Sequence, residues 1–432
     1  MPLFRICSGL FRIWLGFVFY FLSIGFNQAR AAEANELFSS YNPALVQIKT
    51  VNIESGQKSS IGTGFFINAE GRIVTNYHVI SNFIQSPELY RLEFLDNQKQ
   101  TFPVQVLNID VINDLAILEA DKDSNIHFNL ALQPPKKGED IFALGNPHDL
   151  GMIVVPGTYN GIKINSFYDR IHFTGSINPG MSGGPTVDEL GNVVGINVAT
   201  AGNQIGFLVP VEKLHNLITE SVSLDVNSQS QEWFKARITE QLTLNQTQLY
   251  TKIINTEWPL YTLGQASIPN QVSDFMPCWG SSNKDKEKTK YTVATSNCGV
   301  DERIYLSGNM TTGVVQISFS WVHSDELNQL QLGQLFSASL NSRYGHNNGS
   351  EDEVTDFHCD QAIIGNGSAT VSKGVTCVRA YRKYEGLFDV RYHSVLLEKD
   401  HQTLIGRYAL QGVTQQTAQQ FYKKYMENVK WN

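Results

Sequence analysis

Short apolar runs separated by turn residues dominate the first half of the chain, from Tyr41 to about Val211. Runs of this kind are typical of β-strands, and Asn68–Gly71 has the composition of a hairpin turn. No long helical pattern interrupts them, so this half is predicted to be mainly β, a sandwich or barrel. The predicted strands are Ala44–Val51, Ile61–Ile67, Arg72–Thr75, Tyr90–Phe94, Phe102–Asp110, Leu115–Ala120, Asp140–Ala143, Gly161–Ile164, Ile171–Thr174, Pro185–Val187, Val193–Val198 and Gly206–Pro210.

The pattern changes after residue 211. Apolar residues at helical spacing predict a helix over Val211–Ser221 that closes the first domain, and a polar stretch rich in Ser and Gln predicts a linker at residues 223–232. Helical and strand-like segments then follow, which predicts a separate α+β domain over residues 233–432. Its helices are expected at Trp233–Ile254, Glu326–Leu340 and Gln415–Val429, and its strands at Tyr291–Thr295, Arg303–Leu306, Gly313–Trp321, Ala369–Arg382, Leu387–Leu397 and Gln402–Ala409.

Composition and charge narrow the class of protein. Hydrophobic residues make up 42% of the chain and charged residues 17%, which is enough apolar material for packed cores and argues against a disordered or fibrous protein. The net charge of −8 gives no reason to expect nucleic acid or an anionic membrane as a partner.

The N-terminal 31 residues have the pattern of a signal peptide. Arg5 and Arg12 supply positive charge, Ile13–Phe26 is an apolar run, and Ala29–Ala31 offers small residues for cleavage. The alternative, an uncleaved anchor, needs about 20 apolar residues to span a bilayer. We therefore expect residues 1–31 to be removed, with no stable membrane span afterwards and a periplasmic or secreted location. Loss of the three arginines in this segment would take the net charge from −8 to −11.

Four cysteines remain beyond the predicted signal peptide, all of them in the second half of the chain. Four cysteines allow three pairings. Short loops close at the smallest entropic cost, so the expected disulfides are Cys278–Cys298 and Cys359–Cys377. Free thiols are the alternative, but they fit an oxidising compartment less well.

A histidine and an aspartate lie next to two of the predicted strands. His78 follows Arg72–Thr75 in what is expected to be a short turn, and a histidine can act as both base and acid near neutral pH. Asp114 directly precedes an apolar strand, where a carboxylate is costly to bury unless it is hydrogen-bonded. Accepting the ring N–H of His78 would satisfy Asp114 and stabilise the imidazolium. A structural histidine and a turn-forming aspartate are the alternatives, and the turn role suits Asp110 better.

A glycine-rich segment, Asn178–Pro185, contains the candidate nucleophile Ser182. A nucleophilic serine needs a tight loop that exposes its hydroxyl group. The amides of Gly180 and Ser182 would then form an oxyanion hole, and glycines let the backbone approach a substrate closely. The alternative is a glycine-rich turn with an incidental serine. The order histidine, aspartate, serine is that of chymotrypsin, so His78, Asp114 and Ser182 are predicted to form a catalytic triad.

These segments resemble the three catalytic blocks of HtrA/DegP-type trypsin-like serine proteases. The blocks are Thr75–Val79, Asn113–Leu118 and Asn178–Pro185, and Gly195–Asn197 and Gly206–Pro210 match the substrate-strand and closing-strand patterns of that group. The resemblance covers roughly residues 37–220 and places the protease domain at 37–222. It implies a double six-stranded antiparallel β-barrel with the active site between the barrels, and an exported endopeptidase that does not use ATP.

The chain departs from this group at two points. Met181 stands before the serine, where the group usually has asparagine; this position contributes backbone, so activity is still expected. The sequence of residues 222–432 has no Gly-Leu-Gly loop of the kind that PDZ modules use to bind carboxylates. A trimeric cage, PDZ-driven activation and chaperone activity are therefore not implied.

The expected substrates are proteins or peptides. Ser176 is predicted at the base of the specificity pocket with Val198–Thr200 as one wall, and Ile196 and Asn197 complete the substrate strand. No acidic residue lies at that base, so cleavage after small or medium apolar residues is expected. No metal or cofactor is expected. The C-terminal domain is expected to bind substrate, a regulatory partner or another copy. The alternative function is a catalytically silent or partner-activated binding protein on a protease scaffold.

Overall fold

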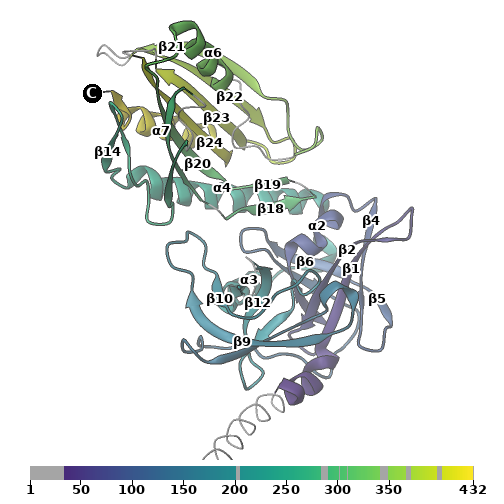
Figure 1. Ribbon diagram of the computed structural model, residues 1–432. Helices are drawn as coiled ribbons and strands as arrows, with labels where there is room; N and C mark the ends of the chain where they lie inside the picture. The colour runs from purple at the N-terminus through teal and green to yellow at the C-terminus, as the bar shows by residue number, and fades with distance from the viewer. Residues whose placement is uncertain are drawn as a thin grey trace, which may run out of the picture.

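A computed structural model describes most of the chain (Figure 1). The described residues are 34–200, 205–283, 290–300, 302–308, 310–340, 349–365, 371–396 and 401–431. The predicted signal peptide, residues 1–31, lies outside them. Two β-rich parts are visible, and a long helix, α4, lies between them.

The first part of the fold is a seven-stranded antiparallel sheet in the order β5-β4-β1-β2-β3-β7-β6. A barrel of six strands was expected here. The structure has seven strands in a sheet, because the predicted strand Phe102–Asp110 is divided after Pro103. Proline has no N–H to donate to a ladder, and the chain changes partner at this point, from β4 to β7. The strands are β1 Leu45–Asn52, β2 Lys58–Phe66, β3 Arg72–Thr75, β4 Tyr90–Leu95, β5 Thr101–Pro103, β6 Gln105–Asp110 and β7 Leu115–Glu119.

A nine-residue helix, α2 (Tyr77–Gln85), follows β3. The prediction of a short turn here was wrong. Asn76 occupies the N-cap position in an extended conformation, and Val79, Ile80 and Ile84 are buried on the sheet side of the helix. The short, β-branched segment gives a weak helix signal by itself. Packing of its apolar face on the sheet decides its conformation.

The second half of the first domain is a closed six-stranded barrel in the order β10-β13-β12-β11-β8-β9, as predicted. A core of fully buried apolar residues fills it and continues into the first sheet. Helix α3 (Val211–Glu220) follows the last strand and packs Leu214 and Leu217 into this core. The strands are β8 Asp140–Gly145, β9 Ile153–Ile162, β10 Ile171–Phe173, β11 Pro185–Val187, β12 Val193–Thr200 and β13 Gly206–Pro210.

Helix α4 (Gln231–Asn255) connects the two parts of the molecule. It begins at Gln231, one residue before the predicted end of the linker at residue 232, and the Ser230 hydroxyl caps it by accepting from the Trp233 amide. The short helix η3 (Val226–Ser228) lies within the predicted linker. Its first half buries Phe234, Ile238 and Leu242 against the first sheet, whereas Leu249, Tyr250 and Ile253 belong to the C-terminal core. The helix therefore packs on both parts, and the domain boundary at residue 233 stays a prediction. Within the described residues, no helix combines the length and apolarity needed to cross a bilayer.

The C-terminal part is α+β, as predicted. A seven-stranded antiparallel sheet in the order β16-β17-β20-β24-β23-β22-β21 carries helix α7 (Gln415–Glu427) on one face. Its strands are β16 Cys278–Ser282, β17 Thr292–Gly299, β20 Val315–His323, β21 His358–Gly365, β22 Val371–Ala380, β23 Phe388–Leu396 and β24 Gln402–Val413. The remaining elements are β14 Leu260–Leu263, β15 Ala266–Pro269 and β25 Lys430–Trp431, the hairpin β18 Ile304–Ser307 and β19 Met310–Thr312, and helix α6 Gln329–Leu340.

Both predicted disulfides are confirmed, and they join the edge strands of this sheet to their neighbours. Cys278–Cys298 links β16 to β17, and Cys359–Cys377 links β21 to β22. The two edge strands are mostly exposed and bury few apolar side chains. Covalent closure of each edge pair compensates for this weak packing by restricting the unfolded chain.

A buried ion pair gives a stability test for the C-terminal part. The Arg379 and Asp389 side chains are only 6% and 4% exposed, and Arg379 Nη2 lies 2.8 Å from Asp389 Oδ2. Replacing Asp389 with alanine leaves a buried guanidinium without this carboxylate, so we expect the free energy of unfolding to fall by about 3–5 kcal/mol. Thermal and urea unfolding measure this. Asp360→Ala, at an exposed position of β21, is the control and should have little effect; similar losses for both variants would contradict the prediction.

Candidate active site

His78 and Asp114 meet through both oxygens of the carboxylate. Asp114 Oδ2 lies 2.6 Å from His78 Nδ1, and Asp114 Oδ1 accepts the His78 backbone N–H at 2.9 Å. The Asn76 side chain donates to the Asp114 carbonyl at 2.7 Å. His78 lies in the first turn of α2, and Asp114 ends the turn between β6 and β7. The carboxylate therefore fixes both the ring and the backbone of His78, and its contact at Nδ1 leaves Nε2 available for a proton.

The turn before β7 presents Asp114 in an uncommon conformation. Asp114 has a φ of 62°, in the left-handed region that aspartate tolerates better than most residues. Asp110 supports the turn because its Oδ1 atom accepts the amides of Ile112 and Asn113, both at 3.0 Å. Asp110 therefore has the turn-forming role that the sequence suggested for it.

The electrostatics of the pair favour the protonated imidazole. Burial by itself lowers the pKa of His78, but the charge of Asp114 and the hydrogen bond to it act in the opposite direction, and the net effect raises the pKa above its usual value. The His78 side chain keeps 29% exposure, compared with 14% for Asp114. His78 can therefore be reached from solvent while its carboxylate partner is shielded.

The loop that carries Ser182 is held by Thr63 of β2. The Thr63 amide donates to the Ser182 carbonyl at 2.8 Å, and the Thr63 hydroxyl donates to the Gly180 carbonyl at 2.7 Å. The Thr63 carbonyl in turn accepts the hydroxyl of Thr75, three residues before His78, at 2.8 Å. One residue thus connects the serine loop to the strand that leads into His78.

Glycine is required at two positions of this loop. Gly183 has a φ of +84°, and a Cβ atom there would lie 2.4 Å from the Thr63 carbonyl oxygen and 2.8 Å from the Asn76 amide. Gly180 has a φ of +95°, and its Cβ would lie 2.4 Å from the carbonyl oxygen of Asn146. The loop therefore packs directly against the backbone that precedes His78. Within the described part of the chain, the amides of Gly180 and Ser182 donate to no acceptor, as an oxyanion hole requires.

Asn197 is an anchor for the serine loop from inside the barrel. Its side-chain amide donates to the carbonyls of Leu144 at 2.9 Å and Met181 at 3.3 Å, and its Oδ1 accepts the Thr186 hydroxyl at 2.6 Å. Met181 is fully buried in the barrel core. The residue before the serine thus acts through packing, and a methionine fills this space well.

The remaining predicted pocket residues are distributed over several environments. Ser176 is half-buried in the loop after β10, and Ile196 is fully buried in the barrel core. Val198 lines a cavity beside Asp114. The side chains of Ala199 and Thr200 lie outside the described residues. Of the three residues expected to form one wall of the specificity pocket, Val198–Thr200, the structure therefore describes the side chain of Val198 alone.

Sequence reasoning missed the residues that the C-terminal part brings to His78. The Tyr305 ring lies 6.0 Å from the imidazole in a T-shaped arrangement, and the Tyr77 hydroxyl donates to the Leu306 carbonyl at 2.8 Å. Tyr77 and Leu306 are 229 residues apart in the sequence. No local pattern could have predicted this contact, although Arg303–Leu306 was expected to be a strand.

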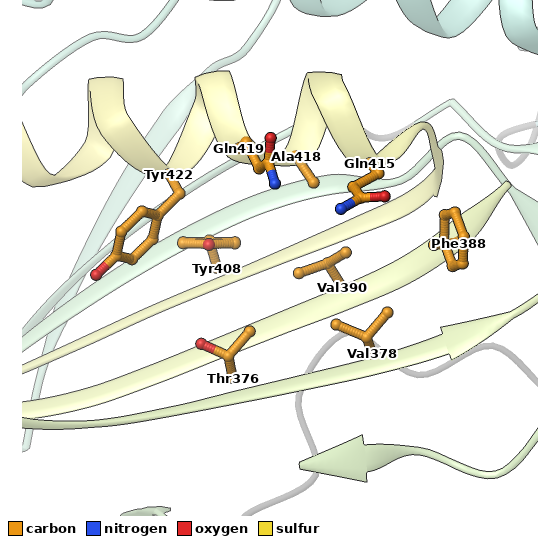
Figure 2. Close-up of a pocket in the computed structure, with 9 residues that line it drawn as sticks. All are labelled: Thr376, Val378, Phe388, Val390, Tyr408, Gln415, Ala418, Gln419 and Tyr422. Atoms are coloured by element: carbon orange, nitrogen blue, oxygen red, sulfur yellow. The ribbon is translucent and has the colours of Figure 1, made fainter. Parts of the chain in front are cut away.

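A second cavity, of about 440 Å³, lies between α7 and the C-terminal sheet (Figure 2). Its walls are mainly apolar, with the side-chain amides of Gln415 and Gln419 on helix α7 and the rings of Tyr408 and Tyr422 at one side. Burial raises the pKa of both tyrosines above the usual value. None of the residues that line this cavity changes charge near neutral pH, so it provides no acid–base machinery comparable to that at His78.

Comparison with known proteins agrees with the fold. The family model of the trypsin-like peptidase domain matches residues 62–196, a range that contains His78, Asp114 and Ser182. The chain therefore carries a trypsin-like peptidase domain.

Relatives of this domain include proteases named Do-like, HTRA and DegP-like, which confirms the resemblance drawn from the motifs. Protease Do-like 1 from Arabidopsis thaliana, a chloroplastic protein, is 29% identical over 43% of this chain and 46% of its own length. Serine protease HTRA1 from Xenopus laevis is 29% identical over 41% of each chain. The probable periplasmic DegP-like endoprotease of Chlamydia pneumoniae is 29% identical over 37% of this chain and 34% of its own length. The chain thus spans less than half the length of these relatives.

Replacing Thr63 with valine tests whether this residue holds the serine loop against the strand that leads into His78. Valine has a similar shape but cannot donate to Gly180 or accept the Asn146 amide, which lies 3.0 Å from the Thr63 hydroxyl. We expect reaction with a serine-directed probe to slow roughly 10- to 100-fold, because each lost hydrogen bond costs about 1–3 kcal/mol and loosens the serine loop. Thr312→Val removes a buried hydroxyl contact to Tyr381 in the C-terminal part and is the control. Equal probe reactivity in both variants would contradict a role for Thr63 in holding the loop.

Proposed function

We propose that this protein is an exported serine endopeptidase that hydrolyses peptide bonds through an acyl-enzyme. Ser182 attacks the scissile carbonyl carbon, and His78 takes the hydroxyl proton at Nε2 and returns it to the leaving amine. Asp114 holds the imidazole at Nδ1 and stabilises its positive charge. The amides of Gly180 and Ser182 stabilise the oxyanion. Water then attacks the acyl group, with His78 again acting as the base.

The observation that carries this proposal is the connection between His78 and the serine loop. Thr63 binds the loop through two hydrogen bonds and receives a third from Thr75, just before His78. Gly183 also packs directly against the Asn76 amide. The serine loop is therefore joined directly to the segment that leads into His78, which supports the proposed triad.

The proposed cleavage preference and the proposed location rest on separate observations. Cleavage after small or medium apolar residues is proposed because the residue at the predicted base of the specificity pocket is Ser176 and not an acidic residue. Export to the periplasm, or secretion, is supported by the two disulfides and by the signal-peptide pattern of residues 1–31. The C-terminal part supports the peptidase domain and shapes access to it.

Covalent labelling tests the proposed function. A fluorophosphonate probe should react with the folded full-length protein, and mass spectrometry should find the adduct on the peptide that contains Ser182. The same protein unfolded in urea should not react, because the serine is activated only by His78 and the oxyanion amides. A folded protein that shows no adduct at Ser182 would overturn the peptidase proposal and favour a catalytically silent protease scaffold that binds partners.

A further inference from the structure

The β18–β19 hairpin of the C-terminal part is docked firmly beside the candidate active site. Its residues Ile304 and Leu306 are 2% and 0% exposed, in the same apolar core as Val79 and Ile80 of helix α2. The Tyr77 hydroxyl binds the Leu306 carbonyl, as described above. Gln85, at the end of α2, also donates to the Tyr384 hydroxyl at 2.7 Å. The hairpin is therefore part of the wall around His78.

The segment just before this hairpin reaches the barrel on the other side of the cleft. Glu302 forms an ion pair with Lys163, which follows β9, and accepts the Ser166 hydroxyl at 2.9 Å. The segment from Glu302 to Leu306 thus contacts the first sheet at α2 and the barrel at Lys163. It bridges the two halves of the peptidase domain on the side where Asp114 lies.

A cavity of about 210 Å³ lies beneath this bridge. Asp114 and Val198 come from the two halves of the peptidase domain, and Arg303 and Tyr305 come from the C-terminal part; Arg170 and Phe207 also line it. Val198 belongs to the strand expected to flank the residue that precedes the cleaved bond. The cavity therefore lies on the acyl side of the scissile bond, where the upstream residues of an extended peptide would pass.

The charges around this cavity leave an excess of positive charge. Asp114 is engaged by His78, and Glu302 is neutralised by Lys163. Arg170 donates to the carbonyls of Asp169 at 3.0 Å and Ile112 at 3.5 Å, and its charge interacts with the nearby carboxylates of Asp114 and Asp110. The Arg303 side chain is exposed at the rim. Among the described residues, Arg303 is thus the guanidinium at this cavity that forms no ion pair.

We propose that this cavity is a substrate subsite for an acidic side chain, two to four residues before the cleaved bond, and that Arg303 and Tyr305 of the C-terminal part determine its specificity. The inference rests on the proposed peptidase function. Tyr305 supplies a rigid wall next to His78, and Arg303 supplies the charge that pairs with an aspartate or glutamate of the substrate. The C-terminal part thereby becomes part of the substrate site.

The test compares cleavage of matched peptides by the full-length protein. Fluorogenic peptides share the residue at the cleaved bond and carry Asp, Ala or Lys at the second, third or fourth position before it. At one of these positions the wild-type kcat/KM should be roughly two- to fivefold higher for Asp than for Lys, the range expected of a partly exposed ion pair. The preference should weaken at high salt, because screening reduces it. Arg303→Glu should reverse the preference at that position.

The control is Lys423→Glu, the same charge change at an exposed position of helix α7 in the C-terminal part. It should keep the wild-type ratio between the Asp and Lys peptides. An unchanged ratio in Arg303→Glu, or an equal gain for all peptides, would overturn the subsite. Fluorophosphonate labelling of the wild-type protein separates the two hypotheses: labelling with no charge preference refutes the subsite alone, whereas absence of labelling refutes the peptidase function.

Discussion

Replacing Ser182 with alanine is expected to lower kcat for hydrolysis of an unfolded protein substrate by a factor on the order of 10⁶. The substitution removes the nucleophile, and no other hydroxyl in the loop Asn178–Pro185 can take its place. The hydrogen bonds that hold the loop use the backbone carbonyls of Ser182 and Gly180, so they survive in the variant. The melting temperature should therefore stay close to that of the wild type.

Release of labelled fragments from a fluorescent unfolded protein measures this effect. Ser176→Ala, a half-buried serine at the predicted pocket base, is the matched control and should change the rate less than tenfold. If Ser182→Ala retained more than a hundredth of the wild-type rate in a preparation free of contaminating protease, the assignment of the nucleophile would be wrong.

Replacing Asp114 with asparagine is expected to lower kcat by roughly 10⁴, because asparagine keeps the shape but favours the wrong tautomer of His78. In the wild type, Asp114 Oδ2 faces Nδ1 at 2.6 Å, so that the ring proton belongs on Nδ1 and Nε2 is free to act as a base. An asparagine amide at this position can donate to Nδ1, which would place the proton on Nε2 and block that role.

The pH dependence gives a second measure of the same contact. His78 must be neutral to act as the base, and Asp114 raises its pKa, so kcat/KM of the wild type should rise with pH through a value above the usual 6.5. In Asp114→Asn this rise should move to lower pH. The stability that the pair contributes should be present in full below pH about 6.5 and be lost as the pH rises through the folded-state pKa.

Asp110→Asn is the matched control for this prediction. It removes the same charge four residues away, keeps an oxygen that can accept the Ile112 and Asn113 amides, and has no contact with His78. Its rate and pH profile should stay near those of the wild type. An Asp114→Asn variant that reacted within tenfold of the wild type, with an unshifted pH profile, would remove Asp114 from the proposed triad.

The sequence by itself determined the features that depend on neighbouring residues. The three predicted catalytic segments are each contiguous, so roles for His78, Asp114 and Ser182 could be proposed from their immediate surroundings. The requirement for glycine at positions 180 and 183 follows from a tight loop. The two disulfides also followed from sequence, because their short loops close at low entropic cost. The long helix α4 was predicted almost to its ends: Trp233–Ile254 was expected, and Gln231–Asn255 is observed.

Only the tertiary structure decided the features that join distant segments. Helix α2 forms because its apolar face packs on the first sheet, and the division of β5 from β6 reflects a change of pairing partner at Pro103. Thr63 lies more than a hundred residues from the loop that it anchors, and Tyr305 lies still further from His78. Such contacts depend on how whole sheets and helices pack, and packing leaves little periodic or compositional signal in either partner. The placement of the C-terminal hairpin at the candidate active site is therefore a property of the folded protein alone.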